Sequence, residues 1–160
     1  MSYTVFRCDN MPGIDNRADI KSVLVVDAAG EKIAAENGSI VKIGAVVPGE
    51  RDLHYATLAS ASDSVEECAV LGTAEVMADE RKKNLNEFRN EAGRAAAAYL
   101  LRKHGEFAVT AEGFVGGTTP TKDAEVGIGA DGKIDAAGTG LGTCIAIEKA
   151  GRHTYYVIAL

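Results

Sequence analysis

Gly127 to Gly132 carry the spacing G-x-G-x-x-G, which in dinucleotide-binding proteins lets a tight turn approach a pyrophosphate. That chemistry also requires a helix directly after the glycines, because the N–H groups of its first turn hold the phosphates. Here Asp131, Gly132 and Lys133 form a hairpin-turn signal, and a further Gly-rich run follows at 136–142. The sequence therefore predicts a hairpin around 131–133 and a turn or bulge at 138–142, and we expect no cofactor there.

The other side chains that could carry chemistry are scattered along the chain. The chain has three histidines: His54, His104 and His153. No two of them have the i, i+4 spacing of a zinc site, and none has a neighbouring His or Cys. The acidic pairs at 66–67 and 79–80 are consecutive residues, so their carboxylates diverge on a strand or on a helix. No G-x-S-x-G elbow marks a nucleophile. The sequence thus predicts no catalytic residue, no metal site and no enzymatic activity.

The composition is that of a globular protein with a small, aliphatic core. With 160 residues the chain can build one good core, so we expect a single domain. Hydrophobic residues make up 46% and charged residues 25%, which argues against a disordered chain. Aromatic residues are only 6% and glycines number 18, so the core must come from Val, Ile, Leu and Ala with many tight turns. A small β-barrel or sandwich fits this composition.

Charge and hydropathy exclude several classes of partner. The net charge of −6 opposes phosphate binding, and the basic cluster at 81–83 is offset by acidic residues at 79–80. The apolar run at 23–26 is too short to cross a bilayer. We therefore expect neither a nucleic-acid nor a membrane partner, and synthesis in the cytoplasm. Three widely separated cysteines, an odd number, favour reduced thiols: Cys8, Cys68 and Cys144.

Alternating apolar residues predict strands along most of the chain. In the C-terminal third, 106–160, four short strands are centred on Phe107 to Val109, Ala124 to Ile128, Thr143 to Ile147, and Tyr155 to Val157. Earlier strands are predicted at 23–26, 39–43, 53–57 and 68–77, separated by turn signals such as Asn37 with Gly38. The fold class is therefore mainly β, with a barrel- or sandwich-like domain, one short helical segment and an extended N-terminal arm.

The segment 80–105 allows two interpretations. Its content of Ala, Glu, Lys, Arg and Leu favours one long helix. Alternatively, Gly93 ends a short helix or loop, 98–101 is a strand, and 102–105 is a hairpin turn into the strand after it. We favour the second interpretation. The predicted domain, 20–160, then comprises a first strand group at 20–78, a helix or loop connector at 79–97 and a barrel-like half at 98–160.

Residues 1–19 show neither helical nor strand periodicity and contain a turn signal at 10–13. We interpret them as an extended arm, the alternative being a poorly ordered terminus. Exposed apolar side chains are unfavourable in water, so a partner is expected to cover those of the arm. The predicted contact residues are Tyr3, Val5, Phe6, Met11 and Ile14.

Three groups of residues resemble structural proteins that accompany a major capsid protein in tailed phages of Gram-positive hosts. The groups are 37–44 with 47–53; 79–88 with 90–93; and 105–110 with 128–133, 145–148 and 155–158. The resemblance covers the chain except its first twenty residues, and Ala95 to Ala98 depart from it. It implies a head decoration or cement protein, a small β-rich fold on the outside of the capsid without enzymatic activity.

The resemblance also implies a partner and a location. The partner would be the major capsid protein, and the protein would lie on the capsid exterior of the virion. It is expected to form a homo-oligomer, namely a trimer. Two alternatives stay open. One is a head–tail connector or tail component, which the same β-rich composition would satisfy. The other is a small-molecule-binding or enzymatic domain that uses the Gly-rich region 127–142.

Overall fold

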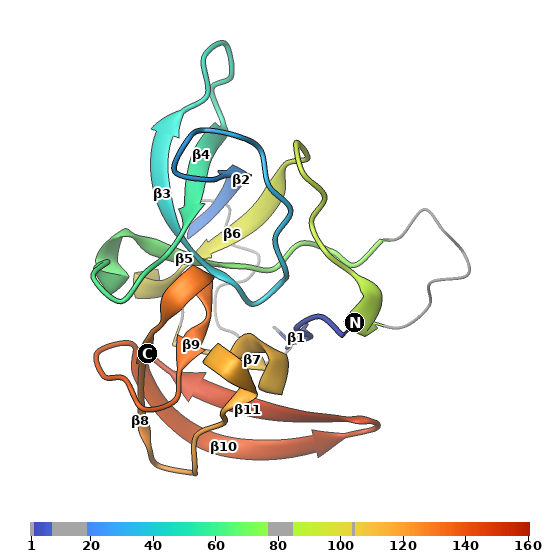
Figure 1. The fold of residues 1–160 in the computed structure, drawn as a ribbon, viewed down its shortest axis with the longest axis vertical. Coiled ribbons are helices and arrows are strands. Elements are labelled where there is room, and N and C mark those ends of the chain that lie inside the picture. Colours follow the sequence, from blue (N-terminus) through green and yellow to red (C-terminus); the bar gives the residue numbers. More distant parts are fainter. Residues whose placement is uncertain (1, 8–18, 77–84, 104) are drawn as a thin grey trace.

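The computed structural model describes residues 2–7, 19–76, 85–103 and 105–160, and its strands form two sheets (Figure 1). One sheet closes into a barrel with the strand order β2-β4-β3-β5-β6. The other is open, with the order β1-β7-β11-β10-β8-β9. The mainly β fold predicted from the sequence is therefore confirmed.

The barrel contains β2 (Ile20–Val26), β3 (Ile40–Val46), β4 (Leu53–Leu58), β5 (Cys68–Leu71) and β6 (Ala96–Leu100). Strands β2 and β4 are parallel, and every other pairing in the barrel is antiparallel. A five-stranded barrel encloses little space, so its inward positions need small or β-branched side chains. Its buried interior is Val23, Val25, Ala35, Val41, Ala56, Ala69, Leu71, Ala96 and Ala98. The alanine-rich run at 95–98, whose composition also suits a helix, thus contributes Ala96 and Ala98 to the lining of a narrow barrel.

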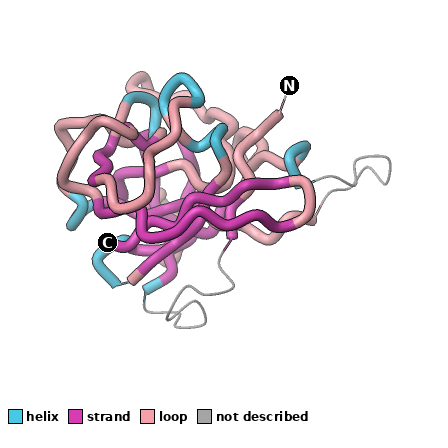
Figure 2. The backbone as a smooth tube through the Cα atoms, turned by 90° about the horizontal axis from the view of Figure 1, so that it is seen from below, coloured by secondary structure: helices cyan, strands magenta, loops and turns pink. Residues whose placement is uncertain are grey.

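The open sheet contains β1 (Phe6–Arg7), β7 (Glu106–Val109), β8 (Glu125–Ile128), β9 (Ile134–Asp135), β10 (Gly142–Ala150) and β11 (His153–Ala159). All its pairings are antiparallel. The two longest strands form the β10–β11 hairpin, whose turn projects away from the rest of the sheet (Figures 1 and 2). The four strands predicted for the C-terminal third are β7, β8, β10 and β11.

The main core lies where the barrel and the open sheet meet. In β3 and β5, Val41 and Ala69 point into the barrel, whereas Ile40 and Val70 point outward and pack with residues of the open sheet. Both faces of β5, and of the first two residues of β3, are therefore buried. The residues of this shared core are Phe6, Ile40, Ala59, Cys68, Val70, Leu101, Phe107, Val109, Phe114, Val126, Ile128, Ile134, Leu141, Cys144 and Ile158. The barrel and the open sheet consequently share this hydrophobic core.

Helical structure in the described residues is confined to single 3-10 turns. They are η2 (Val65–Glu67), η3 (Leu85–Glu87), η4 (Leu101–Lys103), η5 (Ala111–Gly113), η6 (Val115–Gly117) and η7 (Ala130–Gly132). One long helix over 80–105 is therefore wrong, because β6 occupies the middle of it. No helix of the described residues is both long and apolar enough to span a bilayer.

Three sequence-based expectations need correction. The hairpin predicted at 102–105 does not form: β6 pairs with β2 and β5, whereas β7 pairs with β1 and β11, so this segment links the two sheets. The barrel is built from strands within 20–100, and the predicted barrel-like half, 98–160, contributes most of the open sheet. The strand predicted at 68–77 ends at Leu71. Periodicity reveals strands, but it does not reveal which strands pair.

Candidate functional site

The first described residues do not form a free arm. Strand β1 pairs with β7, with Phe6 opposite Val109. Val5 is 1% exposed and Phe6 8% exposed, and the Phe6 ring lies 6.4 Å from the Tyr99 ring and 6.3 Å from the Phe107 ring. The expectation that Val5 and Phe6 are exposed for partner contact is therefore wrong. Their apolar surface is already buried by this chain.

Tyr3 is half-buried and is also held by its own chain. Its backbone N–H donates to the Asn86 carbonyl oxygen at 2.9 Å, and the guanidinium of Arg89 lies 5.8 Å from its ring centroid. Met11 and Ile14, the two other predicted contact residues, lie outside the described residues. Partner contact through these two stays a prediction, and the described structure directs attention to other surfaces.

The Gly-rich region around 127–132 forms the predicted hairpin. Strands β8 and β9 pair antiparallel, and the turn between them is η7. A Cβ on Gly127 would lie 2.7 Å from the Thr139 backbone nitrogen, and one on Gly132 would lie 2.5 Å from the Ile40 carbonyl oxygen. The glycines therefore permit close backbone packing, and no helix of the kind that holds a pyrophosphate follows them.

A shallow pocket of about 290 Å³ borders this region. It is lined by Ala61, Asp63, Ser64, Val65, Ile128, Thr139 and Gly140. The polar side chains just before η2 already have hydrogen-bond partners within the chain. The Asp63 carboxylate accepts from Ser60 and Lys42, and the Ser64 hydroxyl oxygen accepts from the Glu66 N–H. If the Gly-rich region 127–142 binds a small molecule, the alternative left open by the sequence, that molecule would have to lie in this pocket.

The acidic residues, histidines and cysteines of the described part of the chain form no site typical of metal or thiol chemistry. Within these residues, no three His, Cys, Asp or Glu side chains come together to hold a metal ion. Cys68 and Cys144 are free and buried. Burial raises the pKa of the Cys68 thiol to about 11 and raises that of Cys144, because a thiolate is poorly solvated there. Both thiols therefore stay neutral at pH 7, which makes them unreactive.

The β10–β11 hairpin presents a sheet edge on the surface. Strand β8 pairs with β10 only at Gly142 and Thr143, and hydrogen bonds from this side continue to Cys144. Beyond that point, no other strand in the described part of the chain covers this side of β10, so 145–150 is an open edge. Open edges carry unpaired N–H and C=O groups that can pair with another chain. We call residues 145–150 the β10 edge.

Two isoleucines make the β10 edge partly apolar. Ile145 is 38% exposed and Ile147 is 46% exposed. Ile147 stands opposite Tyr156, whose ring packs edge-on against Phe114 at 5.4 Å, so the exposed side chain continues an aromatic cluster. Sequence alternation predicted these strand residues but not their exposure. A register shift between Cys144 and Ala146 places Ile147 on the face of the sheet that also carries Cys144, Tyr156 and Ile158, and no simple sequence signal marks such a bulge.

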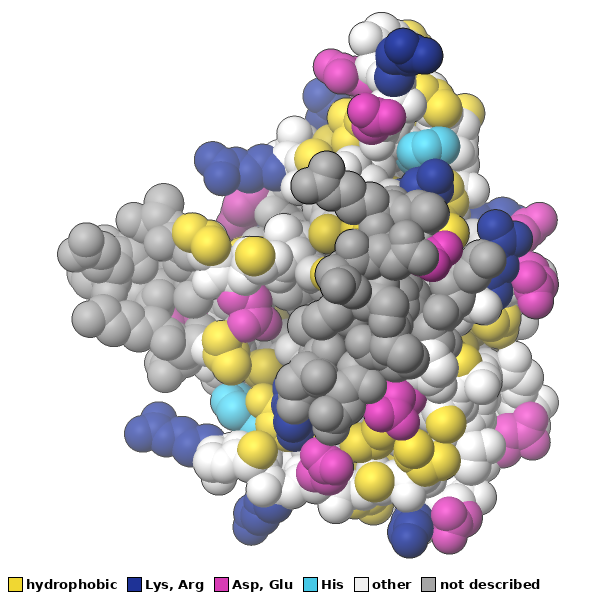
Figure 3. All heavy atoms as spheres, turned by 180° about the vertical axis from the view of Figure 1, so that it is seen from behind, with side chains coloured by type: hydrophobic (Ala, Val, Ile, Leu, Met, Phe, Trp, Pro, Cys, Tyr) yellow, Lys and Arg dark blue, Asp and Glu magenta, His cyan; other side chains and the backbone are white. Residues whose placement is uncertain are grey.

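Charged side chains are mixed over the surface. On the described part of the face in Figure 3, Lys and Arg side chains are interspersed with Asp and Glu. Some pair directly, such as Arg7 with Glu148 at 3.1 Å, which places an ion pair beside the β10 edge. The described part of this face therefore carries charges of both signs.

Comparisons with protein-family models, with curated proteins and with solved structures find no match to this chain.

Proposed function

We propose that this chain is a structural protein of a tailed-phage virion, which decorates the outside of the capsid and stabilises it by binding the major capsid protein. The structural observation that carries the proposal is the β10 edge, with Ile145 and Ile147 exposed beside an open strand. The resemblance carried by the three groups of residues that begin at Asn37, Asp79 and Gly105 supplies the class of partner.

The edge suits binding by strand addition. An extended segment of the capsid protein would pair with the backbone of 145–147 and cover both isoleucines. The bulge before Ala146 and the charge of Lys149 keep the flat apolar part of the edge short. A single contact of this size is weak. Repeated over a symmetric shell, and with several copies of this chain joined in an oligomer, weak contacts give high overall avidity.

The acidic character of the chain supports an external location. A net charge of −6 is repelled by packaged DNA, whereas it is tolerated on the outer surface, where it also favours solubility. The rigid barrel would face away from the shell as a compact body. We place the trimer expected from the resemblance on the capsid exterior as part of the same proposal.

The test is co-sedimentation of the purified protein with capsids of the phage that encodes it. Saturable binding at many copies per shell is expected. The double variant Ile145→Lys with Ile147→Lys should lose this binding, because charge at both positions opposes burial at an interface. The matched control is Val46→Lys, since Val46 is 46% exposed, like Ile147, but lies on the barrel. Circular dichroism melting verifies that each variant folds.

The outcomes separate the alternatives. Absence of binding by the unchanged protein overturns the decoration role. Undiminished binding by the double isoleucine variant overturns the assignment of the β10 edge. A small fixed number of copies per virion, confined to one vertex, favours a head–tail connector instead.

A further inference from the structure

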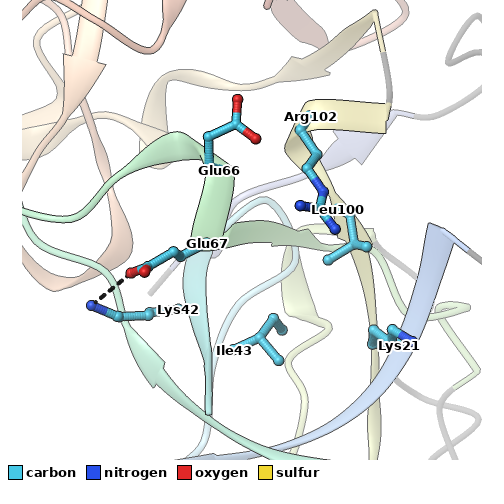
Figure 4. Close-up of a pocket in the computed structure, with 7 residues that line it drawn as sticks. All are labelled: Lys21, Lys42, Ile43, Glu66, Glu67, Leu100 and Arg102. Carbon is cyan, nitrogen blue, oxygen red and sulfur yellow. Dashed lines mark ion pairs between the residues drawn. The ribbon is translucent and has the colours of Figure 1, made fainter.

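A pocket of about 380 Å³ lies at one end of the barrel, between η2 and η4 (Figure 4). Its lining combines basic, acidic and aliphatic side chains: Lys21, Lys42, Ile43, Glu66, Glu67, Leu100 and Arg102. These residues come from three barrel strands and two 3-10 turns, so only the closed barrel brings them together. Barrel mouths are common places for ligand sites, and this volume falls within the usual range of such sites.

Strand register explains why a lysine faces this mouth. Lys21 is paired with Ala98, and Val23 with Ala96, in the β2–β6 ladder. Residues directly opposite each other share a face of the sheet, and Val23, Ala96 and Ala98 form the barrel interior. Lys21 therefore occupies the last inward position of β2, at the barrel's open end. Ile43 and Leu100 pack against the same interior core and give the pocket an aliphatic floor.

The three basic side chains of the pocket differ in their partners. The ammonium of Lys42 is neutralised within the chain, at 3.0 Å from both Asp63 Oδ1 and Glu67 Oε2. No such ion pair or hydrogen bond joins Lys21 or Arg102 to another described residue. In Figure 4 the Arg102 guanidinium points into the space beside Leu100 and above Ile43. Within the described residues, two cations without an ion-pair partner, Lys21 and Arg102, thus flank an aliphatic floor.

We infer that the barrel mouth binds a carboxylate carried on a short aliphatic stem. The guanidinium of Arg102 offers the planar pair of N–H donors that matches a carboxylate, and Lys21 supplies a second positive charge. The stem would lie on Ile43 and Leu100 and remove their exposed surface from water. The site does not rest on the proposed function, because it belongs to the barrel whereas the β10 edge belongs to the open sheet.

The acidic residues of the pocket restrict the charge of the ligand. Glu66 has no ion-pair partner among the described residues, and its carboxylate is part of the pocket wall. In Figure 4 this carboxylate points away from Ile43, so it does not fill the space above the floor. Its negative charge would repel a second charge on the ligand. A monocarboxylate is therefore favoured over an inorganic phosphate dianion.

The experiment is a titration of the full, ¹⁵N-labelled chain with isocaproate, followed by backbone amide chemical shifts. Isocaproamide is the neutral control, and inorganic phosphate is the dianion control. Saturable shifts around Lys21, Leu100 and Arg102 are expected with isocaproate, at dissociation constants in the millimolar range because the probe is small. Arg102→Gln should weaken the binding by roughly tenfold. Arg152→Gln, an exposed arginine on the β10–β11 turn, should leave it unchanged.

A second arm distinguishes the source of the carboxylate. A capped Leu-Glu-Leu peptide, compared with its Leu-Gln-Leu counterpart, presents the same chemistry as part of a protein. Binding of isocaproate alone assigns a small free acid, and binding of the glutamate peptide assigns a protein carboxylate. The inference is overturned if neither probe gives saturable shifts, if isocaproamide or phosphate binds equally well, or if Arg102→Gln binds as the unchanged chain does.

Discussion

The carboxylate of Glu36 holds Thr4 by two hydrogen bonds: its Oε2 accepts from the Thr4 backbone N–H at 2.9 Å and from the Thr4 hydroxyl at 2.7 Å. The same oxygen lies 3.3 Å from the ammonium of Lys133, which also donates to the Glu112 carbonyl oxygen. Residue 36 precedes β3 of the barrel, whereas Lys133 precedes β9 of the open sheet. This cluster therefore attaches residues 2–7 to both sheets at once.

Thr4→Val should lower the free energy of unfolding by about 1–2 kcal/mol. The substitution keeps the β-branched shape but removes a hydrogen bond to a charged group at a site that is only 2% exposed. Urea denaturation measures the change. Thr57→Val is the control, because Thr57 is an exposed strand residue, and it should change stability by less than about 0.5 kcal/mol. Equal effects of the two variants would contradict a structural role for the Thr4–Glu36 pair.

Phe6→Ala should destabilise the chain by about 3 kcal/mol or more, because it empties a volume in the shared core between Tyr99 and Phe107. Phe6→Leu should cost less, since it keeps most of the apolar volume. Chemical denaturation of the unchanged chain and of the two variants, Phe6→Ala and Phe6→Leu, measures the three free energies of unfolding. A Phe6→Ala protein as stable as the unchanged chain would mean that residues 2–7 are an unattached arm, as first expected from the sequence.

Gly132→Ala should destabilise the chain by about 1–3 kcal/mol more than Gly30→Ala, which is the usual cost of overpacking. Both glycines have positive φ, +69° and +86°, so both variants incur the strain of a left-handed residue, about 1 kcal/mol. Only Gly132 has a neighbour: a Cβ there would lie 2.5 Å from the Ile40 carbonyl oxygen, and nothing lies within 4 Å at Gly30. Thermal unfolding of both variants isolates the packing contribution. Similar melting temperatures would disprove a close approach of the β8–β9 turn to the barrel.

Asp63 should contribute stability that is lost in acid. Hydrogen bonds from the Ser60 backbone and from Lys42 hold its pKa below the ordinary value, so folding favours the ionised form. The contribution is therefore present above the unfolded-state pKa, about 3.9, and is lost as pH falls through the lower folded-state pKa. Asp63→Asn should cost about 1 kcal/mol at pH 7 and progressively less as the pH is lowered below about 4. Urea denaturation over this pH range measures it, and a difference that persists undiminished at the acidic end would refute the assignment.

Local structure could be predicted from the residue pattern alone. Apolar, β-branched runs placed β2 and β3, and alternating apolar residues placed β4 and the strands of the C-terminal third. Both patterns are properties of the strand's own residues and do not depend on which strand it pairs with. Turn chemistry placed Gly38 and Gly93, which both have positive φ, and the β8–β9 hairpin. The choice of a strand after Gly93 was also correct, since β6 begins at Ala96.

The way in which these strands combine could not be predicted from the residue pattern, because it depends on contacts between distant segments. Closure of the barrel depends on β2 pairing with β4 and β6, which are distant in sequence, and on alanines that fit its narrow interior. The burial of Phe6 depends on its pairing with β7, and the face of the sheet on which Ile147 lies depends on a bulge. Lys21 and Arg102 share one pocket only because β2 and β6 are neighbours. Such pairings depend on packing between distant segments, whereas local propensity is a property of neighbouring residues.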